Sequence, residues 1–228
     1  MLFRSTDNAS HFDLGIIPAD VPDIGGIAVA VWHGSDGNLW LAYNPTPVDD
    51  ATFWETRPTP VAENAGSHVV MKIDPEGGVH LAYLDSELAY LRYTYLPTFN
   101  ANDSEKKTVL VDARFSSGQY NGIAIRNFGT EAAPDYRPVI STFSTTYAGT
   151  RAAIRVAWPV TNLAGLTDGA DMDTSEYSGS WEVMLVPAVT TPQSAKSFIE
   201  ITNPTGANQL VVGYNGTYLE EATYLGTP

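Results

Sequence analysis

The sequence contains no cysteine among its 228 residues, so disulfide bonds, zinc–thiolate sites and cysteine nucleophiles are excluded. Basic residues are also scarce. The chain has 12 Lys and Arg against 26 Asp and Glu, which gives a formal net charge of −14. Nucleic-acid binding needs clustered positive charge, so no nucleic-acid partner is expected. The longest apolar runs, such as Gly26–Trp32, are too short to span a bilayer, and no membrane insertion is expected.

The N-terminal residues show no export signal. Met1–Arg4 is followed by polar residues instead of an apolar segment, so no signal peptide is visible. The protein is then either cytoplasmic or begins after a cleaved leader. Its few lysines and its many Thr, Gly, Asn, Tyr and Pro residues are typical of exported β-proteins. We therefore expect an extracellular, periplasmic or cell-surface location.

The residues that are present suit one all-β domain. Hydrophobic residues make up 43% of the chain and aromatic residues 11%, which is enough to form a core. Short runs rich in β-branched and aromatic residues, bounded by Gly, Asn, Asp or Pro, predict strands. Leu91–Tyr95 and Ile154–Trp158 alternate with a period of two residues, as strands with unlike faces do. No segment carries a helical stripe.

Four segments of the chain resemble one another. Gly37–Tyr43 and Gly77–Tyr83 share the pattern Gly-x-x-x-Leu-Ala-Tyr, and looser copies occupy residues 138–143 and 208–214. In every copy a small residue precedes the closing aromatic residue, and a hydroxyl residue follows three positions after it. The closing aromatics are Tyr43, Tyr83, Phe143 and Tyr214. Regular spacing of such units indicates a repeat architecture.

Each unit contains a strand, a polar turn, a second strand and a third strand. Residues 59–63, 108–113 and 180–186 could supply fourth strands. Four strands in about 40–50 residues is the pattern of a β-propeller blade. The sequence therefore predicts a flexible segment at residues 1–9 and a single propeller domain at 10–228, with an ordinary β-sandwich as the alternative. The predicted blades are residues 24–66, 67–117, 118–194, and 195–228 together with 10–17.

Residues 10–17 are assigned to the last blade because that blade has no fourth strand of its own. Ser10–Ile17 is strand-like, and pairing it with residues 219–225 would cover an edge that is otherwise an aggregation hazard. The N-terminal strand would then close a ring of four blades. Two alternatives stay open: the chain is part of a larger propeller, or two chains complete one ring.

The second unit resembles bacterial β-propeller repeats that are distantly related to the Asp-box repeats of sialidases. The matching segments are Val70–Tyr83, Asp85 with Ser86, Leu91–Tyr93, Gly118–Ile125 in the third unit, and a degenerate Asp-box at Ser35–Trp40 in the first. The resemblance extends over about residues 24–226. It implies a propeller in which Asp and Gly form the turns and aromatic residues pack between blades. It implies no activity, because these residues are structural.

No catalytic constellation coincides with the repeats. A sialidase needs three arginines that converge on a carboxylate, and the arginines here do not occupy corresponding places. His80 takes the strand position of Trp40, which predicts a core histidine, and His33 is predicted to be solvated. The motifs of zinc proteases, serine hydrolases and phosphate loops are absent. The protein is predicted not to be an enzyme.

An acidic segment at residues 168–176 offers one candidate metal site. Asp168, Asp171 and Asp173 could supply several oxygens to a hard cation such as Ca²⁺. Their order is not that of an EF-hand, and the competing interpretation is a solvated surface loop. Apart from this calcium ion, no cofactor is predicted.

Aromatic residues near turns are the candidate ligand-binding residues, because exposed aromatics are enriched at interfaces. They are Trp32, Trp54, Tyr90 and Tyr218. The competing interpretation places them between blades. The predicted function is a non-enzymatic binding or scaffold module with a protein or glycan ligand. A carbohydrate-binding propeller is the alternative, a glycoside hydrolase comes third, and a homo-oligomer or larger assembly is left open.

Overall fold

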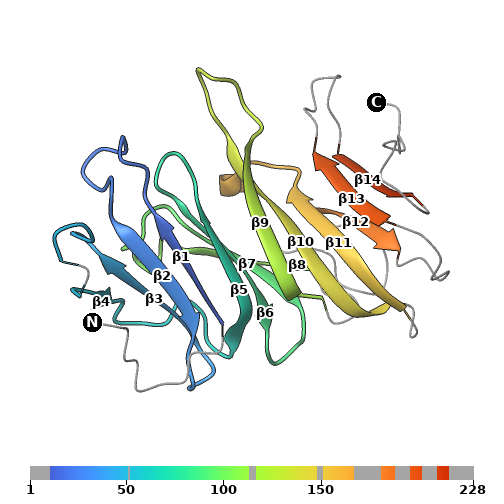
Figure 1. Ribbon diagram of the computed structural model, residues 1–228, viewed down its shortest axis with the longest axis horizontal. Coiled ribbons are helices and arrows are strands. Elements are labelled where there is room, and N and C mark those ends of the chain that lie inside the picture. The colour runs from blue at the N-terminus through green and yellow to red at the C-terminus, as the bar shows by residue number, and fades with distance from the viewer. Residues whose placement is uncertain are drawn as a thin grey trace. The chain divides into compact units, whose positions relative to one another are not determined.

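The fold consists almost entirely of strands (Figure 1). The computed structural model describes residues 11–50, 52–112, 117–147, 151–166, 181–187, 196–201 and 210–215. In these ranges the only other regular element is a 3₁₀ turn, Leu163–Gly165. The all-β class predicted from the sequence is therefore confirmed. None of the helical structure in the described ranges has the length and apolarity needed to cross a bilayer.

Three four-stranded antiparallel sheets follow one another, and in each the strands lie side by side in chain order. The first sheet contains β1 (Phe12–Ile16), β2 (Ala28–His33), β3 (Leu39–Asn44) and β4 (Glu55–Thr56). The second contains β5 (Ala65–Ile73), β6 (Val79–Asp85), β7 (Leu91–Leu96) and β8 (Lys107–Asp112). The third contains β9 (Gln119–Asn127), β10 (Tyr136–Tyr147), β11 (Arg151–Pro159) and β12 (Trp181–Pro187).

The chain divides into two compact units, Met1–Met184 and Leu185–Pro228. In the second unit, β13 (Lys196–Ile201) and β14 (Leu210–Asn215) form an antiparallel hairpin. Lys196 lies opposite Asn215 at one end of this hairpin, and Ile201 lies opposite Leu210 at the other.

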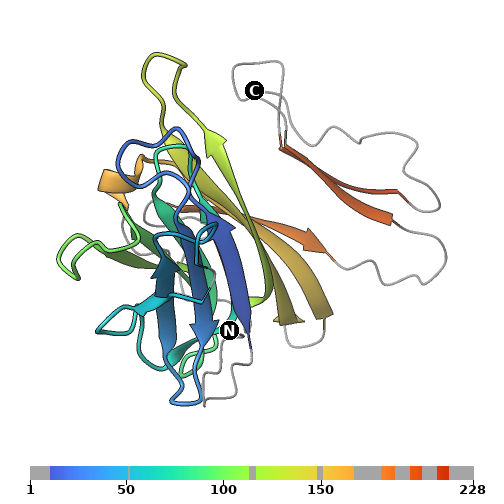
Figure 2. The same cartoon turned by 60° about the vertical axis from the view of Figure 1, so that its left-hand side comes forward.

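Apolar residues on both faces of the second sheet form two cores. Val79, Leu81 and Tyr83 of β6 belong to the core shared with the first sheet, which lies in front of the second in Figure 2. Ala82 of β6 and Tyr93 of β7 belong to the core shared with the third sheet. A strand covered on both faces reads as a nearly continuous apolar run, which explains the composition of β6.

The first strands of the three sheets are neighbours. β1 lies beside β5, and β5 lies beside β9 (Figure 1). Side chains bridge both gaps, because the Met71 N–H donates to Asp13 Oδ2 (2.8 Å) and Asn121 Nδ2 donates to the His68 carbonyl (3.0 Å). β1, β5 and β9 therefore occupy corresponding places in successive sheets.

In the first sheet, this strand correspondence disagrees with the repeat predicted from the sequence, because the repeat aligned a third strand with a second strand. Leu39–Tyr43 lies in the third strand of its sheet and so matches Leu91–Tyr95 of β7, whereas the sequence paired it with Val79–Tyr83 of β6. Second and third strands have the same alternation and similar turn residues, so local similarity cannot tell them apart. Of the predicted fourth strands, 108–113 and 180–186 correspond to β8 and β12, and 59–63 shows one isolated bridge, between Leu39 and Ala62.

The N-terminal strand belongs to the first sheet. The sequence predicted that residues 10–17 pair with 219–225, but β1 pairs with β2, with Phe12 opposite Trp32. The Ile17 N–H donates to the Ile27 carbonyl at 2.9 Å and extends this pairing by one step beyond Ile16 and Ala28. Residues 219–225 lie outside the described residues.

Replacing Tyr83 tests the core between the first and second sheets. Its side chain is fully buried, and its hydroxyl is 2.8 Å from Thr94 Oγ1. We expect Tyr83→Ala to lower the free energy of unfolding by about 3–5 kcal/mol, the cost of deleting a buried aromatic ring. The control Tyr83→Phe should cost only about 1 kcal/mol, because it removes one hydrogen bond. Urea denaturation measures both, and an unchanged Tyr83→Ala midpoint would contradict the packing described here.

Candidate ligand-binding site

The turn aspartates have structural roles, as the sequence predicted. Asp74 Oδ1 accepts the backbone N–H groups of Glu76 (2.8 Å) and Gly78 (2.9 Å) in the turn between β5 and β6. Asp36 acts in the same way between β2 and β3, where its carboxylate accepts the Asn38 N–H at 3.1 Å and the Trp40 indole N–H at 3.0 Å. These backbone contacts order the two turns.

His80 is a core residue, which confirms the sequence prediction. Its Nε2 lies 2.9 Å from Asp74 Oδ2, and its Nδ1 lies 2.7 Å from the Tyr93 hydroxyl. A neutral imidazole satisfies both contacts when Nε2–H donates to Asp74 and Nδ1 accepts from Tyr93. Burial lowers the pKa of His80 despite the opposing effect of Asp74, which favours this neutral form. The side chain is completely buried, so the group cannot meet a substrate.

The aromatic residues predicted to bind ligand lie on separate elements. Trp32 is on β2, Trp54 directly precedes β4, and Tyr90 lies in the turn between β6 and β7, each half-buried. Tyr218 lies outside the described residues.

The predicted calcium ligands Asp168, Asp171 and Asp173 also lie outside the described residues. In the part of the chain that the structure describes, no group of three or more His, Asp or Glu side chains is placed to hold a metal ion.

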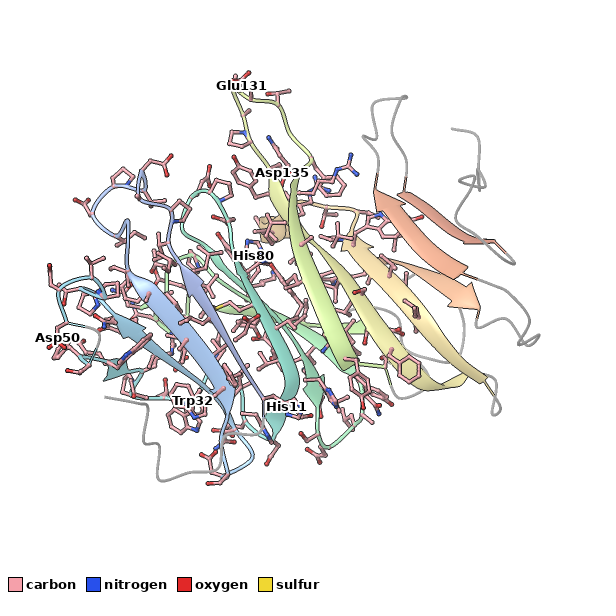
Figure 3. The ribbon with its side chains drawn as sticks, viewed as in Figure 1. His11, Trp32, Asp50, His80, Glu131 and Asp135 are labelled. Atoms are coloured by element: carbon pink, nitrogen blue, oxygen red, sulfur yellow. The ribbon has the colours of Figure 1, made fainter. Side chains whose placement is uncertain are left out.

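A row of rings that the sequence analysis missed lies where the first strands of the three sheets begin. His11 directly precedes β1, His68 lies in β5 and Tyr120 lies in β9. The ring centroids of His11 and His68 are 4.6 Å apart, and those of His68 and Tyr120 are 4.8 Å apart. His33 adjoins His11 at 6.4 Å, and Phe143 adjoins Tyr120 at 6.0 Å. We call these five residues the ring row; Figure 3 labels His11 at its place beside Trp32.

A repeated backbone irregularity positions two members of the ring row. Gly66 and His68 both have positive φ, +113° and +54°, and Gly118 and Tyr120 repeat this with +97° and +46°. The glycines are required, because a Cβ on Gly118 would lie 2.9 Å from the Tyr90 carbonyl oxygen. The pattern Gly-x-ring at two strand starts is the signal that sequence reasoning could have used.

Two imidazoles of the ring row, those of His11 and His68, have a lowered pKa and so resist protonation. Burial lowers the pKa of His11, and the neighbouring His33 lowers it further. Burial also lowers the pKa of His68, and His11 adds to this effect. His11 and His68 are therefore neutral at pH 7, where they present uncharged ring faces.

A cavity of about 330 Å³ adjoins the Tyr120 end of the ring row. The residues that line it are Tyr120 of β9, Ser141, Thr142 and Phe143 of β10, and Ile154 of β11. The Thr142 hydroxyl is already used, because it accepts the Gly118 N–H at 2.8 Å. Among these described lining residues the side chains are hydroxyl, aromatic or aliphatic.

The fold and the site together define an all-β protein. Its four-stranded antiparallel sheets follow one another, and the ring row lies where their first strands begin. Comparisons with protein-family models, with curated proteins and with solved structures found no match to this chain.

Acid should destabilise the protein through the ring row. The folded state lowers the pKa of His11 and of His68 below the ordinary 6.5. Above pH 6.5 both imidazoles are neutral in the folded and the unfolded chain, and the full stability is present. As the pH falls through the lowered pKa values, the unfolded chain binds protons more readily and that stability is lost. We expect the free energy of unfolding to decrease as the pH falls below 6.5. The double variant His11→Asn/His68→Asn should show a shallower decrease in denaturant titrations. Equal slopes for the two proteins would show that these imidazoles are not coupled to folding.

Proposed function

We propose that this chain is a non-enzymatic β-propeller that binds a protein or glycan ligand at the ring row, as an exported or cell-surface binding or scaffold module. The observation that carries the proposal is the ring row itself. Rings from the beginnings of three successive first strands, those of His11, His68 and Tyr120, lie in contact at one end of the sheets, and aromatic residues are enriched at binding interfaces. The export part of the proposal rests on the composition of the sequence.

The arrangement of the sheets supports the propeller. Successive meanders of four strands with neighbouring first strands are what propeller blades provide. In β5, Val69 and Met71 are buried in the core shared with the preceding sheet. The corresponding face of β1 carries Phe12, Leu14 and Ile16, which are 77%, 58% and 63% exposed. In a closed ring of four blades, a fourth blade would cover this apolar face.

The chemistry of the cavity supports binding over hydrolysis. Glycoside hydrolysis uses a pair of carboxylates about 5–10 Å apart. The cavity beside Tyr120 is lined by hydroxyl, aromatic and aliphatic side chains. A carbohydrate-binding propeller is the second candidate, and the exposed Tyr120 ring favours it because an aromatic face can stack on a sugar ring.

Ring closure predicts a large effect of a charge on β1. If the face of Leu14 is covered by a fourth blade, Leu14→Lys should lower the free energy of unfolding by about 3 kcal/mol or more, because it buries an unpaired charge. The matched control is Val48→Lys, at a side chain that is 96% exposed, and it should change stability by less than about 0.5 kcal/mol. Urea denaturation compares the two variants. Equal small effects would contradict a closed ring.

Ligand arrays test the binding function directly. We expect wild-type protein to bind at least one member of an immobilised glycan or peptide array, and His68→Asn to weaken that binding about tenfold or more. Asn tolerates positive φ, so this variant keeps the backbone while it removes the ring. The control Phe53→Ser alters a half-exposed ring elsewhere and should bind normally. Turnover of aryl glycosides, or no binding on either array, would overturn the proposal.

A further inference from the structure

Tyr120 is a costly residue for the folded chain. Its φ of +46° lies in the left-handed region, which costs a bulky L-residue about 1–2 kcal/mol. The side chain is also 73% exposed, so burial recovers little of that cost. Gly or Asn would fit this backbone better. A strained, exposed ring points to a role outside folding, because such strain collects at ligand sites.

The cavity beside this ring has mostly apolar walls. The Tyr120 and Phe143 rings meet edge to face, with centroids 6.0 Å apart and planes at 71°, and Ile154 adds an aliphatic wall. Its volume of about 330 Å³ is at the lower end of ligand pockets, which run to about 300–1,000 Å³. The cavity is open to solvent, and its size suits one compact group.

The lining residues that the structure describes offer few polar groups to a sugar or an anion. The Thr142 hydroxyl accepts from the Gly118 N–H at 2.8 Å and contacts the Gln119 carbonyl oxygen at 3.3 Å. That leaves the hydroxyls of Ser141 and Tyr120, whereas a sugar ring needs several partners for its own hydroxyls. An anion needs a cationic or backbone N–H partner, and none of the five lining side chains supplies a charge.

An aromatic ring fits the apolar residues that line this cavity. It can meet Tyr120 and Phe143 edge to face or offset, which adds about 0.5–1.5 kcal/mol per pair beyond the burial of apolar area. We propose that the cavity formed by β9, β10 and β11 binds an aromatic ring, presented by a peptide side chain or by a small aromatic molecule. This inference rests on the proposed binding function and names the chemistry of its ligand.

Titration with simple probes tests the inference on the whole chain. N-acetyl-tryptophanamide, N-acetyl-leucinamide and methyl glucopyranoside are each added while NMR signals of Tyr120, Phe143 and Ile154 are followed. We expect saturable shifts with the tryptophan probe, at least about fivefold weaker binding of the leucine probe, and none of the glucoside. Tyr120→Asn should weaken tryptophan binding about tenfold and raise the melting temperature, because Asn relieves the strained backbone. Ser141→Leu, which fills the cavity from another wall, should weaken binding similarly, and Phe53→Ser should not.

Two further ligands distinguish the source of the ring. Tighter binding of a Gly-Gly-Trp-Gly-Gly peptide than of free indole assigns the cavity to a polypeptide partner, and the reverse order assigns it to a small aromatic molecule. No saturable shift with any aromatic probe, or stronger binding of the glucoside, would overturn the inference. If an array ligand still binds wild type and depends on His68, the proposed function survives that failure.

Discussion

Burial of the second sheet on both faces is the constraint on which the rest of the described structure depends. β6 contributes Leu81 and Tyr83 to one core and Ala82 to the other, so the first and third sheets must cover opposite faces of the same strand. Burial of apolar area is the main favourable term in folding. A chain that folded only one of these neighbours would leave the other face of β6 in water.

Polar contacts determine how the sheets align once they are stacked. Asp13 and Asn121 join the backbones of neighbouring first strands, and Arg155 of β11 pairs with Asp112 of β8. The last pair is buried, so losing either partner would leave an uncompensated charge. Apolar packing is non-directional and does not by itself select one alignment of the sheets. Hydrogen bonds and ion pairs between specific atoms do select one.

The ring row is a consequence of this alignment. The Gly-x-ring bulge recurs at the starts of β5 and β9, and neighbouring first strands then bring the rings of His68 and Tyr120 into contact. The backbone strain at these positions opposes folding, while it places the rings of His68 and Tyr120 4.8 Å apart. A repeat that serves folding thus also produces the surface that we assign to a ligand.

Local chemistry made part of this structure readable from the sequence. Alternation and turn residues predicted an all-β chain and the Asp74 turn, because each depends on residues within a few positions of one another. The burial of His80 was predicted instead from its place in the repeat. The same reasoning gave the wrong phase for Leu39–Tyr43, since strands of one sheet have similar local patterns. It also chose candidate ligand residues by their nearness to turns, which selected Trp54 and Tyr90. The contacts of Tyr120 with His68 and Phe143 depend on how the sheets pack, and the local pattern did not indicate them.

What the sequence by itself determined was therefore the class of secondary structure and the chemistry of individual turns. The tertiary structure alone decided that β1 joins β2, that three first strands are neighbours, and that a cavity forms between Tyr120, Phe143 and Ile154. The physical reason is that each of these features needs side chains from strands that are distant in the chain. Their distances depend on how whole sheets pack, and no local pattern encodes that packing.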